Sequence, residues 1–354
     1  MPDTVKKETF KDAEGYFNQP FSFKSKNIHS FQLNEAQAQH DRTAIRYHYT
    51  SASALMSILK TDNEGCGSIR FTDARYMNDR SEYMFFIKRL LEYMEEGKKT
   101  FPHCQEVINH LLLKNHTVDE YKSLHVFEVE DVEYGAFSFI KKRHFLFCLS
   151  KENDSLHMWN YYLRNGYYQG YNIGIKVYDF LSHFDYDSNE KHAPIMFFCG
   201  NVLYNKKKQE EEIEDLCGTI EDVMNRTSDN SFSLQIGMIY LWTYIESFGL
   251  FYKDEAFSDE QEYRIVIRYE EGFTEKPITS FFQDSYKGIE YEYFERNGII
   301  VPCLKVPLIK NAVKQITMAP KFEKSIVSVA LEDFLSFNGY QDVKVVQSSI
   351  PIRY

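Results

Sequence analysis

The order of predicted strands and helices limits the fold of this 354-residue chain more than any other feature. Apolar or alternating segments predict strands near residues 44–49, 69–72, 145–150, 170–177, 263–269, 298–307, 313–318 and 343–347. The apolar run FLFCLS at 145–150 is typical of a strand that is buried on both faces. These strands outnumber the helices that could connect parallel neighbours. The pattern therefore predicts a mixed, mostly antiparallel α+β fold with flanking helices.

Charge and periodicity divide the chain into three parts. Residues 1–42 are polar, show little periodicity, and are predicted to form an N-terminal arm. Residues 43–354 are predicted to form a single α+β domain. Within it, residues 185–240 carry many charges, including an acidic run at 210–214. This segment predicts a helical acidic insertion whose charged side chains face solvent.

Composition argues against several classes of protein. A formal net charge of -11 leaves no general basic surface for sequence-independent nucleic-acid binding. No run of about 18 apolar residues predicts a membrane span, and the first ten residues lack a signal-peptide core. The 6 cysteines are scattered without a C-x-x-C pair, so they signal neither a zinc site nor a disulfide framework. We therefore expect a cytoplasmic protein with reduced thiols, no metal and no membrane partner, and leave homo-oligomer formation open.

Three polar clusters follow predicted strands and could reach a ligand. The first is the H-Y-T segment of His48, Tyr49 and Thr50, which precedes a helix N-terminus that favours anions. The second contains Asn78, which helix capping by its neighbours leaves unassigned. The third is Ser150, which ends the FLFCLS strand. A packed histidine bonded to backbone and an ordinary strand-end serine are the structural alternatives for His48 and Ser150.

A fourth cluster lies at the start of a later strand. Glu260, Glu262 and Arg264 are expected to share one face, because strand side chains alternate with a period of two. Two carboxylates that lie so close repel each other unless a cation compensates, and Arg264 can do this only in part. The pattern is compatible with a structural salt bridge and with a catalytic carboxylate that the arginine holds.

In this order, the motifs resemble the bacterial family named domain of unknown function 2971. The matching segments are 48–50 (HYT), 78–82 (NDRSE), 150–159 (SKENDSLHMW), 260–264 (EQEYR) and 348–353 (SSIPIR). Each motif is weak alone, but five in order are specific, and together they cover nearly the whole folded chain from about residue 47 to residue 353. We expect the greatest departure from the family within the charged segment 185–235.

A looser resemblance implies an activity. The H-Y-T strand with its following helix, then Phe71-Thr72 and an asparagine-containing turn, looks like the start of the DNA-modifying ADP-ribosyltransferase toxins. The E-x-E entering a late strand looks like the catalytic glutamate motif of ADP-ribosyltransferases. This resemblance implies an ADP-ribosyltransferase-like fold and NAD as substrate. It also implies Glu262 as the catalytic carboxylate and Glu260 as its partner.

The same resemblance implies a binding site for NAD. His48 would orient the ribose or the nicotinamide amide, and Ser150 would support the nicotinamide side of the pocket. Aromatic rings such as Tyr49 or Trp159 could stack on nicotinamide. The complete expected binding set is His48, Tyr49, Thr50, Asn78, Ser150, Trp159 and Arg264.

Three functions are compatible with these residues. The leading one is NAD-dependent ADP-ribosyl transfer or NAD hydrolysis by a bacterial toxin or phage-defence effector, with protein, nucleic acid or water as acceptor. The second is a non-catalytic nucleotide-sensing or protein-interaction module that uses the same cleft. The third is a metal-dependent hydrolase or nuclease that holds a divalent ion with Glu82, Glu260 and Glu262.

Geometry separates these functions. The transferase requires His48, Ser150 and Glu262 to converge on one cleft, with Glu262 unburied and free to meet a ribose. The sensor requires Glu262 to be capped by Arg264 and occluded. The metal enzyme requires at least three carboxylate oxygens to point at a common centre.

Overall fold

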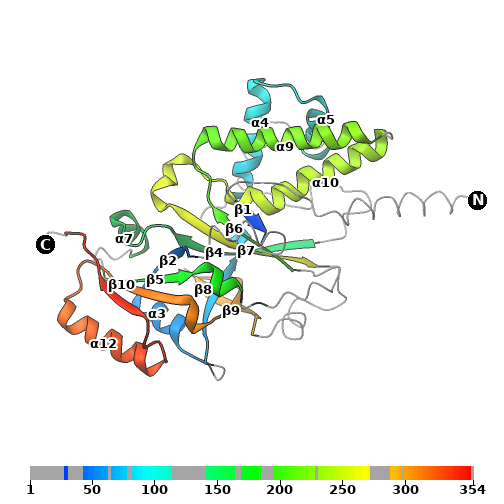
Figure 1. Cartoon of the computed structure of the whole chain (residues 1–354). Coiled ribbons are helices and arrows are strands. Elements are labelled where there is room, and N and C mark those ends of the chain that lie inside the picture. The colour runs from blue at the N-terminus through cyan, green and yellow to red at the C-terminus, as the bar shows by residue number, and fades with distance from the viewer. Residues whose placement is uncertain are drawn as a thin grey trace, which may run out of the picture.

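A computed structural model describes residues 28–30, 43–62, 65–77, 82–113, 141–163, 169–182, 184, 195–227, 230–271, 288–296 and 298–351 (Figure 1). The strands are β1 (Ile28–Ser30), β2 (Ile45–Thr50), β3 (Gly67–Asp73), β4 (Lys141–Ser150), β5 (Tyr171–Lys176), β6 (Ile195–Asn201), β7 (Glu262–Glu271), β8 (Glu290–Arg296), β9 (Ile299–Leu308), β10 (Val313–Met318) and β11 (Lys344–Gln347). The α-helices are α3 (Ala52–Leu59), α4 (Glu82–Glu96), α5 (Pro102–Leu111), α7 (Leu156–Tyr162), α8 (Val177–Leu181), α9 (Lys206–Arg226), α10 (Asn230–Phe248) and α12 (Lys324–Phe337). Short 3-10 helices are η1 (Ala74–Tyr76), η3 (Gly249–Phe251), η4 (Glu255–Glu260) and η5 (Lys310–Ala312).

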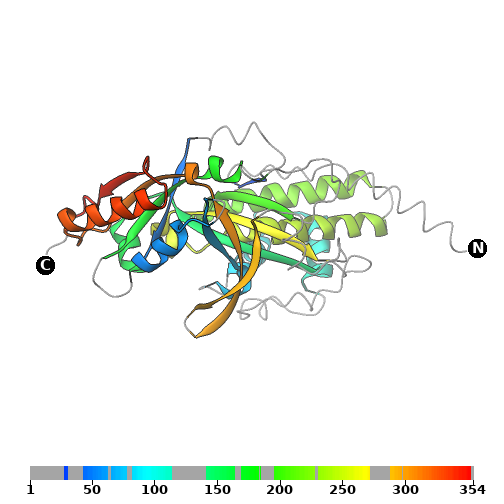
Figure 2. The same ribbon diagram turned by 90° about the horizontal axis from the view of Figure 1, so that it is seen from below.

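The strands join in one open 11-stranded sheet with the main order β1-β6-β7-β4-β2-β5-β10-β11. Every pairing in it is antiparallel except that of β10 with β11. The predicted mixed, mostly antiparallel α+β class is therefore confirmed. Strands β1, β6 and β8 were not predicted. The hairpin of β8 and β9 reaches away from the rest of the sheet (Figure 2).

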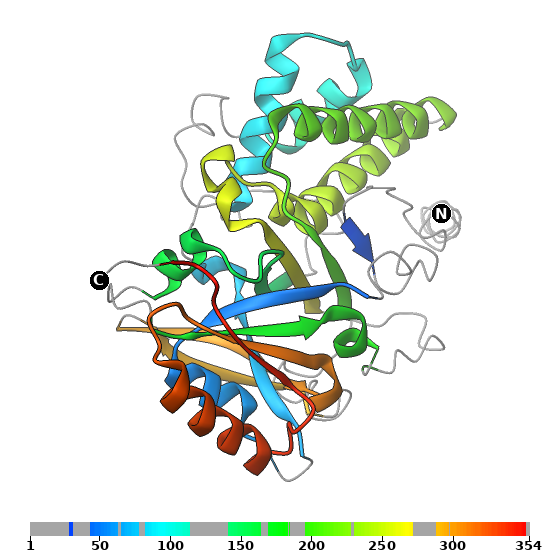
Figure 3. The same ribbon diagram turned by 60° about the vertical axis from the view of Figure 1, so that its left-hand side comes forward.

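Two hydrophobic cores cover the two faces of the sheet. On one face, side chains of β4, β7, β5 and β10 pack with α3, α8 and α12. On the other face, α4, α5, α9 and α10 pack over β4, β6 and β7. Figure 3 shows α3 and α12 side by side below the sheet and the helical layer of α4, α5, α9 and α10 above it. Because β4 lies between both cores, its apolar run is buried on both faces, as the sequence predicted.

The predicted helical character of the segment 185–240 is confirmed by α9 and α10, but its description as an insertion needs two corrections. The segment 185–240 contains a sheet strand, β6, which pairs with β7 along its whole length. In addition, α9 is amphipathic: Lys207 and Glu211 are exposed as predicted, but its apolar stripe, with Ile213, Leu216 and Ile220, is buried against α5 and α10. The helices of this segment are therefore an integral layer of the domain.

The predicted N-terminal arm also needs correction. Residues Ile28–Ser30 form β1, which pairs antiparallel with β6 at an edge of the sheet. The rest of segment 1–42 lies outside the described residues. Among the described residues, no helix combines the length and apolar character that crossing a bilayer requires.

The sheet forks at β4, and this fork positions the candidate site. One edge of β4 pairs with β7 over all ten residues. The other edge is shared between two strands: β3 pairs at Phe145 and Leu146, whereas β2 pairs only at Ser150. The opposite edge of β2 pairs with β5 along its whole length, from Ile45 to Thr50. Two branches of the sheet thus leave the same edge of β4, one through β3 and the other through β2 at Ser150.

Candidate functional site

A small pocket lies at the fork of the sheet. It has room for roughly one water molecule as it stands. Its walls come from β2, β4, β7, α7 and the end of η4, and its lining residues are Tyr47, His48, Tyr49, Cys148, Leu149, Ser150, Met158, Tyr162, Glu260 and Glu262. The structure therefore brings together five of the residues that the sequence singled out: His48, Tyr49, Ser150, Glu260 and Glu262.

Glu262 is held at the base of this pocket by two cations. Arg264 donates from Nε to Glu262 Oε1 over 3.0 Å and from Nη2 to Oε2 over 2.8 Å. The Nζ of Lys253 lies 3.4 Å from Oε2. Burial raises the pKa of Glu262, but the charges of Arg264 and Lys253 outweigh it and lower the pKa to about 2. The carboxylate is ionised at physiological pH. It is buried, whereas the transferase geometry requires it to be free.

Lys253 is a site residue that the sequence did not indicate. It follows η3 and is buried, and its Nζ lies 2.7 Å from Glu260 Oε2 as well as near Glu262. A lone lysine after an aromatic helix looks like an ordinary solvated residue at a helix end. Only the fold shows that this ammonium bridges both glutamates of the E-x-E motif.

Glu260 and Glu262 meet this ammonium for a reason other than strand alternation. The strand begins at Glu262, whereas Glu260 ends η4. Between them Gln261 adopts a left-handed conformation with φ 44°, which an L-residue rarely adopts. The predicted shared strand face for Glu260 and Glu262 is therefore wrong, and the turn at Gln261 brings their carboxylates to the same cation.

Ser150 fixes this turn from the neighbouring strand. Its hydroxyl donates to the carbonyl of Glu260 over 2.8 Å and accepts from the backbone N–H of Glu152 over 3.1 Å. In the register of the sheet, Ser150 stands between Tyr47 of β2 and Glu262 of β7. Its hydroxyl is thus a structural contact that sets the position of the E-x-E segment.

His48 fills the space where β2 and β4 separate. Its Nδ1 lies 3.2 Å from the carbonyl oxygen of Cys148, and its ring centroid lies 4.9 Å from that of Phe147. Since a carbonyl only accepts hydrogen bonds, Nδ1 carries the proton in this contact. Burial lowers the pKa of His48, so the ring is neutral near pH 7 and its Nε2 is left as an acceptor.

Trp159 and Thr50 lie outside the pocket lining. Trp159 is fully buried and donates from Nε1 to Asp154 Oδ1 over 2.8 Å, while its ring packs edge-on against Tyr49 at 4.6 Å. Thr50 is buried at the end of β2. Arg264 lies behind Glu262, and Asn78 lies outside the described residues.

Asp154 links two of the sequence motifs, although they are distant in the chain. Its carboxylate accepts from the hydroxyl of Ser348 over 2.7 Å and from the backbone N–H of Ser349 over 2.8 Å, besides the bond from Trp159. Burial raises the pKa of Asp154, but these hydrogen bonds outweigh it and lower the pKa. The S-S-I-P segment therefore anchors the start of α7, whose residues Met158 and Tyr162 cover the pocket.

Among the described residues, no group of three or more His, Cys, Asp or Glu side chains is arranged to hold a metal ion. The pocket instead contains two carboxylates that are neutralised by two cations. The metal-dependent alternative has no supporting cluster in that part of the chain.

Comparison with known proteins gives one match. Searches among curated proteins and among solved structures found no match to the chain. A family model described as "Protein of unknown function (DUF2971)" matches residues 158–265. The matched segment contains the charged region 185–235, where the sequence suggested the greatest departure from the family. It begins at Met158 in α7 and ends just after Arg264, so it contains the pocket residues Met158, Tyr162, Glu260 and Glu262. This match confirms the resemblance to the DUF2971 family over residues 158–265.

Proposed function

We propose that the pocket at the fork binds the nicotinamide riboside part of NAD. The protein would cleave the bond between nicotinamide and ribose, as an ADP-ribosyltransferase or NAD glycohydrolase. The observation that supports this proposal is the meeting of His48, Ser150 and Glu262 from three neighbouring strands on one pocket. The looser resemblance of the H-Y-T and E-x-E motifs to ADP-ribosyltransferases points to the same chemistry. A role as a toxin or phage-defence effector would fit this activity.

The proposed step requires Glu262 to become accessible, because its carboxylate is buried and bound by Arg264 and Lys253. When the C1′–N bond breaks, nicotinamide leaves with the electron pair, and positive charge develops on the ribose until an acceptor oxygen attacks C1′ and loses its proton to solvent. A carboxylate beside the ribose stabilises that charge, and Glu262 is ionised throughout the physiological pH range. The neutral ring of His48 can accept a hydrogen bond at Nε2 from a ribose hydroxyl or the nicotinamide amide.

Access to the pocket requires a change in α7. Nicotinamide riboside is larger than the space for roughly one water molecule that the pocket offers. Met158 and Tyr162 form the α7 side of the pocket, and Tyr162 is 39% exposed at its mouth. We therefore expect these two side chains to move outward when NAD binds.

A second function is favoured by the pairing of Glu262. Both of its oxygens are engaged, by Arg264 and Lys253, and the four charges of Glu260, Glu262, Lys253 and Arg264 sum to zero. In a non-catalytic nucleotide-sensing or protein-interaction module, this cluster would be purely structural. Such a module would bind its ligand in the same pocket without cleaving it.

Nicotinamide release separates the two functions. We expect purified protein to release nicotinamide from NAD, alone or with cell lysate as acceptor source, and expect Glu262→Gln to lower the rate by about 100-fold or more, as loss of a transition-state charge does. Glu255→Gln is the matched control, because Glu255 is exposed on η4 close by in the chain. Circular dichroism checks that both variants are folded.

The alternative outcomes are informative. NAD binding without nicotinamide release, in both the wild-type protein and Glu262→Gln, would support the sensing module. Equal release by the wild-type protein and Glu262→Gln would remove Glu262 from the chemistry. If the protein neither binds NAD nor releases nicotinamide from it, NAD is ruled out as the ligand.

A further inference from the structure

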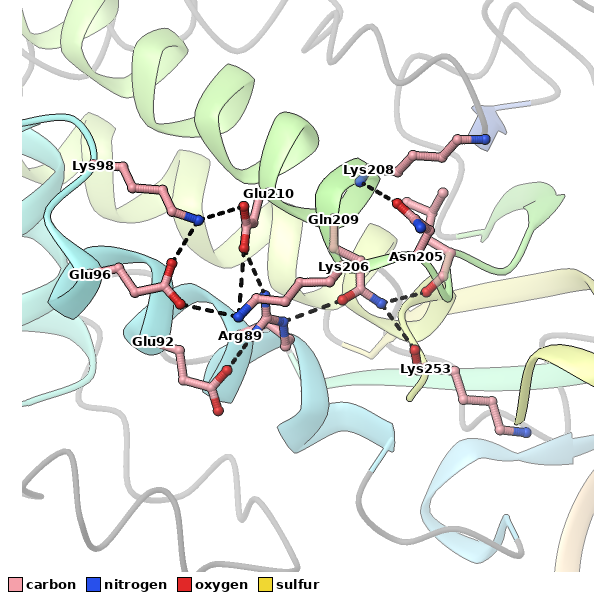
Figure 4. Close-up of polar contacts among 11 residues, drawn as sticks. Arg89, Glu92, Glu96, Lys98, Asn205, Lys206, Lys208, Gln209, Glu210 and Lys253 are labelled. Atoms are coloured by element: carbon pink, nitrogen blue, oxygen red, sulfur yellow. Dashed lines mark hydrogen bonds and ion pairs between the residues drawn. The ribbon is translucent and has the colours of Figure 1, made fainter. Parts of the chain in front are cut away.

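The helical layer reaches the candidate site through one buried amide. The side chain of Gln209, on α9, is only 1% exposed, and both Nε2 and Oε1 of its amide make hydrogen bonds. Its Nε2 donates to the carbonyl oxygens of Leu203 over 2.6 Å and Lys253 over 3.0 Å, and its Oε1 accepts from Nε of Arg89 over 3.3 Å (Figure 4). Gln209 therefore connects α4, the end of β6 and the loop that carries Lys253.

The environment of Gln209 requires an amide. Two acceptors lie on one side of the group and a guanidinium, which only donates, lies on the other. A carboxylate would place an acceptor against two carbonyl oxygens, and an apolar side chain would leave them without this donor in a buried position. The same arrangement fixes which end of the amide is oxygen and which is nitrogen.

Arg89 is itself held in place by charges at the surface of the helical layer. It is mostly buried, pairs with Glu92 on its own helix, and lies 3.5 Å from Glu210 of α9. Glu210 also accepts from Lys98 over 2.8 Å (Figure 4). Glu210, at the start of the acidic run, thus lies beside the arginine that donates to Gln209.

The backbone that Gln209 contacts determines where the ammonium of Lys253 lies. The N–H of Lys253 donates to Leu203 over 3.2 Å, so one carbonyl receives both this bond and the one from Gln209. The side chain of Lys253 is buried and ends 2.7 Å from Glu260 and 3.4 Å from Glu262. A small shift of this backbone would carry the ammonium away from one carboxylate or both.

We propose that Gln209 is a positioning residue that holds Lys253 between Glu260 and Glu262, and that this contact is how the helical layer supports the pocket. The functional meaning of this contact rests on the pocket being the site proposed above. The contact itself is tested without NAD, so its failure and the failure of the proposed function are distinguishable.

The pH dependence of stability reports on Lys253. Arg264 and Lys253 together overcome the effect of burial and lower the pKa of Glu262 to about 2. A lowered folded-state pKa stabilises the protein above the unfolded value and loses that stability as the pH falls towards the folded value. When Lys253 is displaced, the folded pKa of Glu262 lies closer to the unfolded one, and less stability is lost in acid.

The groups that face Glu262 are Lys253, Glu260, Arg264, Cys148, Tyr162 and Tyr204. His48 lines the same pocket, and burial lowers its pKa from the ordinary value. Cysteine, tyrosine, lysine and arginine ordinarily titrate far above the range from about pH 6 to about pH 3. Glu260 pairs with the same ammonium, so displacement of Lys253 weakens the ion pairs of both carboxylates.

The test compares Tm at about pH 6 and about pH 3 in four variants. Gln209→Met removes the hydrogen bonds of the amide at similar volume. Lys253→Met removes the cation, and the double variant combines both. Ile213→Val is the matched control, because Ile213 is buried on the same helix and has no polar contact with the pocket. We expect the fall in Tm between the two pH values to be smaller in both Lys253→Met and Gln209→Met than in the wild-type protein. The difference from the wild-type protein in Gln209→Met should be at least half of the difference in Lys253→Met.

Two results decide the proposal. In the double variant, we expect the acid response of Lys253→Met alone, because Gln209 acts through Lys253. Ile213→Val should lower Tm equally at both pH values. The proposal is overturned if Gln209→Met behaves like Ile213→Val, or if its effect on the acid response adds fully to that of Lys253→Met. If Lys253→Met does not fold, the comparison of Gln209→Met with Ile213→Val alone decides.

Discussion

Arg264→Ala is expected to reduce the free energy of unfolding by about 3–5 kcal/mol, the usual cost of removing one partner of a buried ion pair. Arg264 is fully buried, makes two hydrogen bonds to Glu262 and donates through Nη1 to the carbonyl of Leu250. Without it, Lys253 is the one cation that remains beside the Glu262 carboxylate among the groups named above, and burial then favours protonation. We expect Tm to fall by on the order of 10 °C.

Thermal and urea unfolding of two further variants check this expectation. Arg264→Lys keeps the charge but cannot form the two parallel bonds, so it should lose part of the stability. Arg226→Ala is the control, because Arg226 is 79% exposed and lies 4.0 Å from an equally exposed Asp222. It should change stability by less than about 1 kcal/mol. A similarly small change in Arg264→Ala would contradict the buried pairing.

Trp159→Ala is expected to cost about 3–5 kcal/mol, as truncation of a fully buried large aromatic residue does. The ring of Trp159 packs with Tyr49, Met158 and Leu163 in a small core of its own. Its loss also removes one of the donors to Asp154. The wall of the pocket that α7 provides should loosen together with this core.

Trp159→Phe separates packing from hydrogen bonding. It keeps most of the buried ring but removes the bond to Asp154, so we expect a cost of about 1 kcal/mol. Chemical denaturation of both variants measures the two contributions. If Trp159→Ala left stability unchanged but abolished binding of a nicotinamide ligand, the stacking role that the sequence suggested would be restored and the packing role would be wrong.

The sequence predicted the class of the fold because its strands carry strong local patterns. The FLFCLS run of β4 and the alternation of β5 are readable without tertiary contacts. By contrast, β6 lies in a highly charged segment, although Ile195–Asn201 itself is apolar (IMFFCGN). The charge of the surrounding residues hid this strand, and the packed face of α9 was hidden in the same way.

The residues that line the pocket were identified in part from the sequence, because they lie near the ends of predicted strands. His48, Ser150 and Glu262 could be placed at strand ends, and the fork at β4 brings them together. Lys253 and Gln209 could not be found, because each is joined to the site by contacts between segments that are distant in the chain. A single lysine or glutamine carries no local pattern that reveals such a contact.

Trp159 shows the opposite error. An aromatic residue in a motif was expected to stack on a ligand, whereas its indole N–H is bound by Asp154 and its ring is fully buried. An aromatic ring that completes a core and one that contacts a ligand follow the same sequence pattern. The difference depends on Ser348 and Ser349, which hold Asp154 from nearly two hundred residues away.

The proposed NAD site is tested most directly by a crystal structure of Glu262→Gln grown with NAD at saturating concentration. We expect the C1′ carbon of the nicotinamide ribose to lie within about 3–4 Å of the side chain of residue 262, as reacting groups do. We also expect His48 to contact the ribose or amide, and Met158 and Tyr162 to be displaced. NAD bound at a different place, or a closed pocket without NAD, would contradict the proposal that this pocket cleaves NAD.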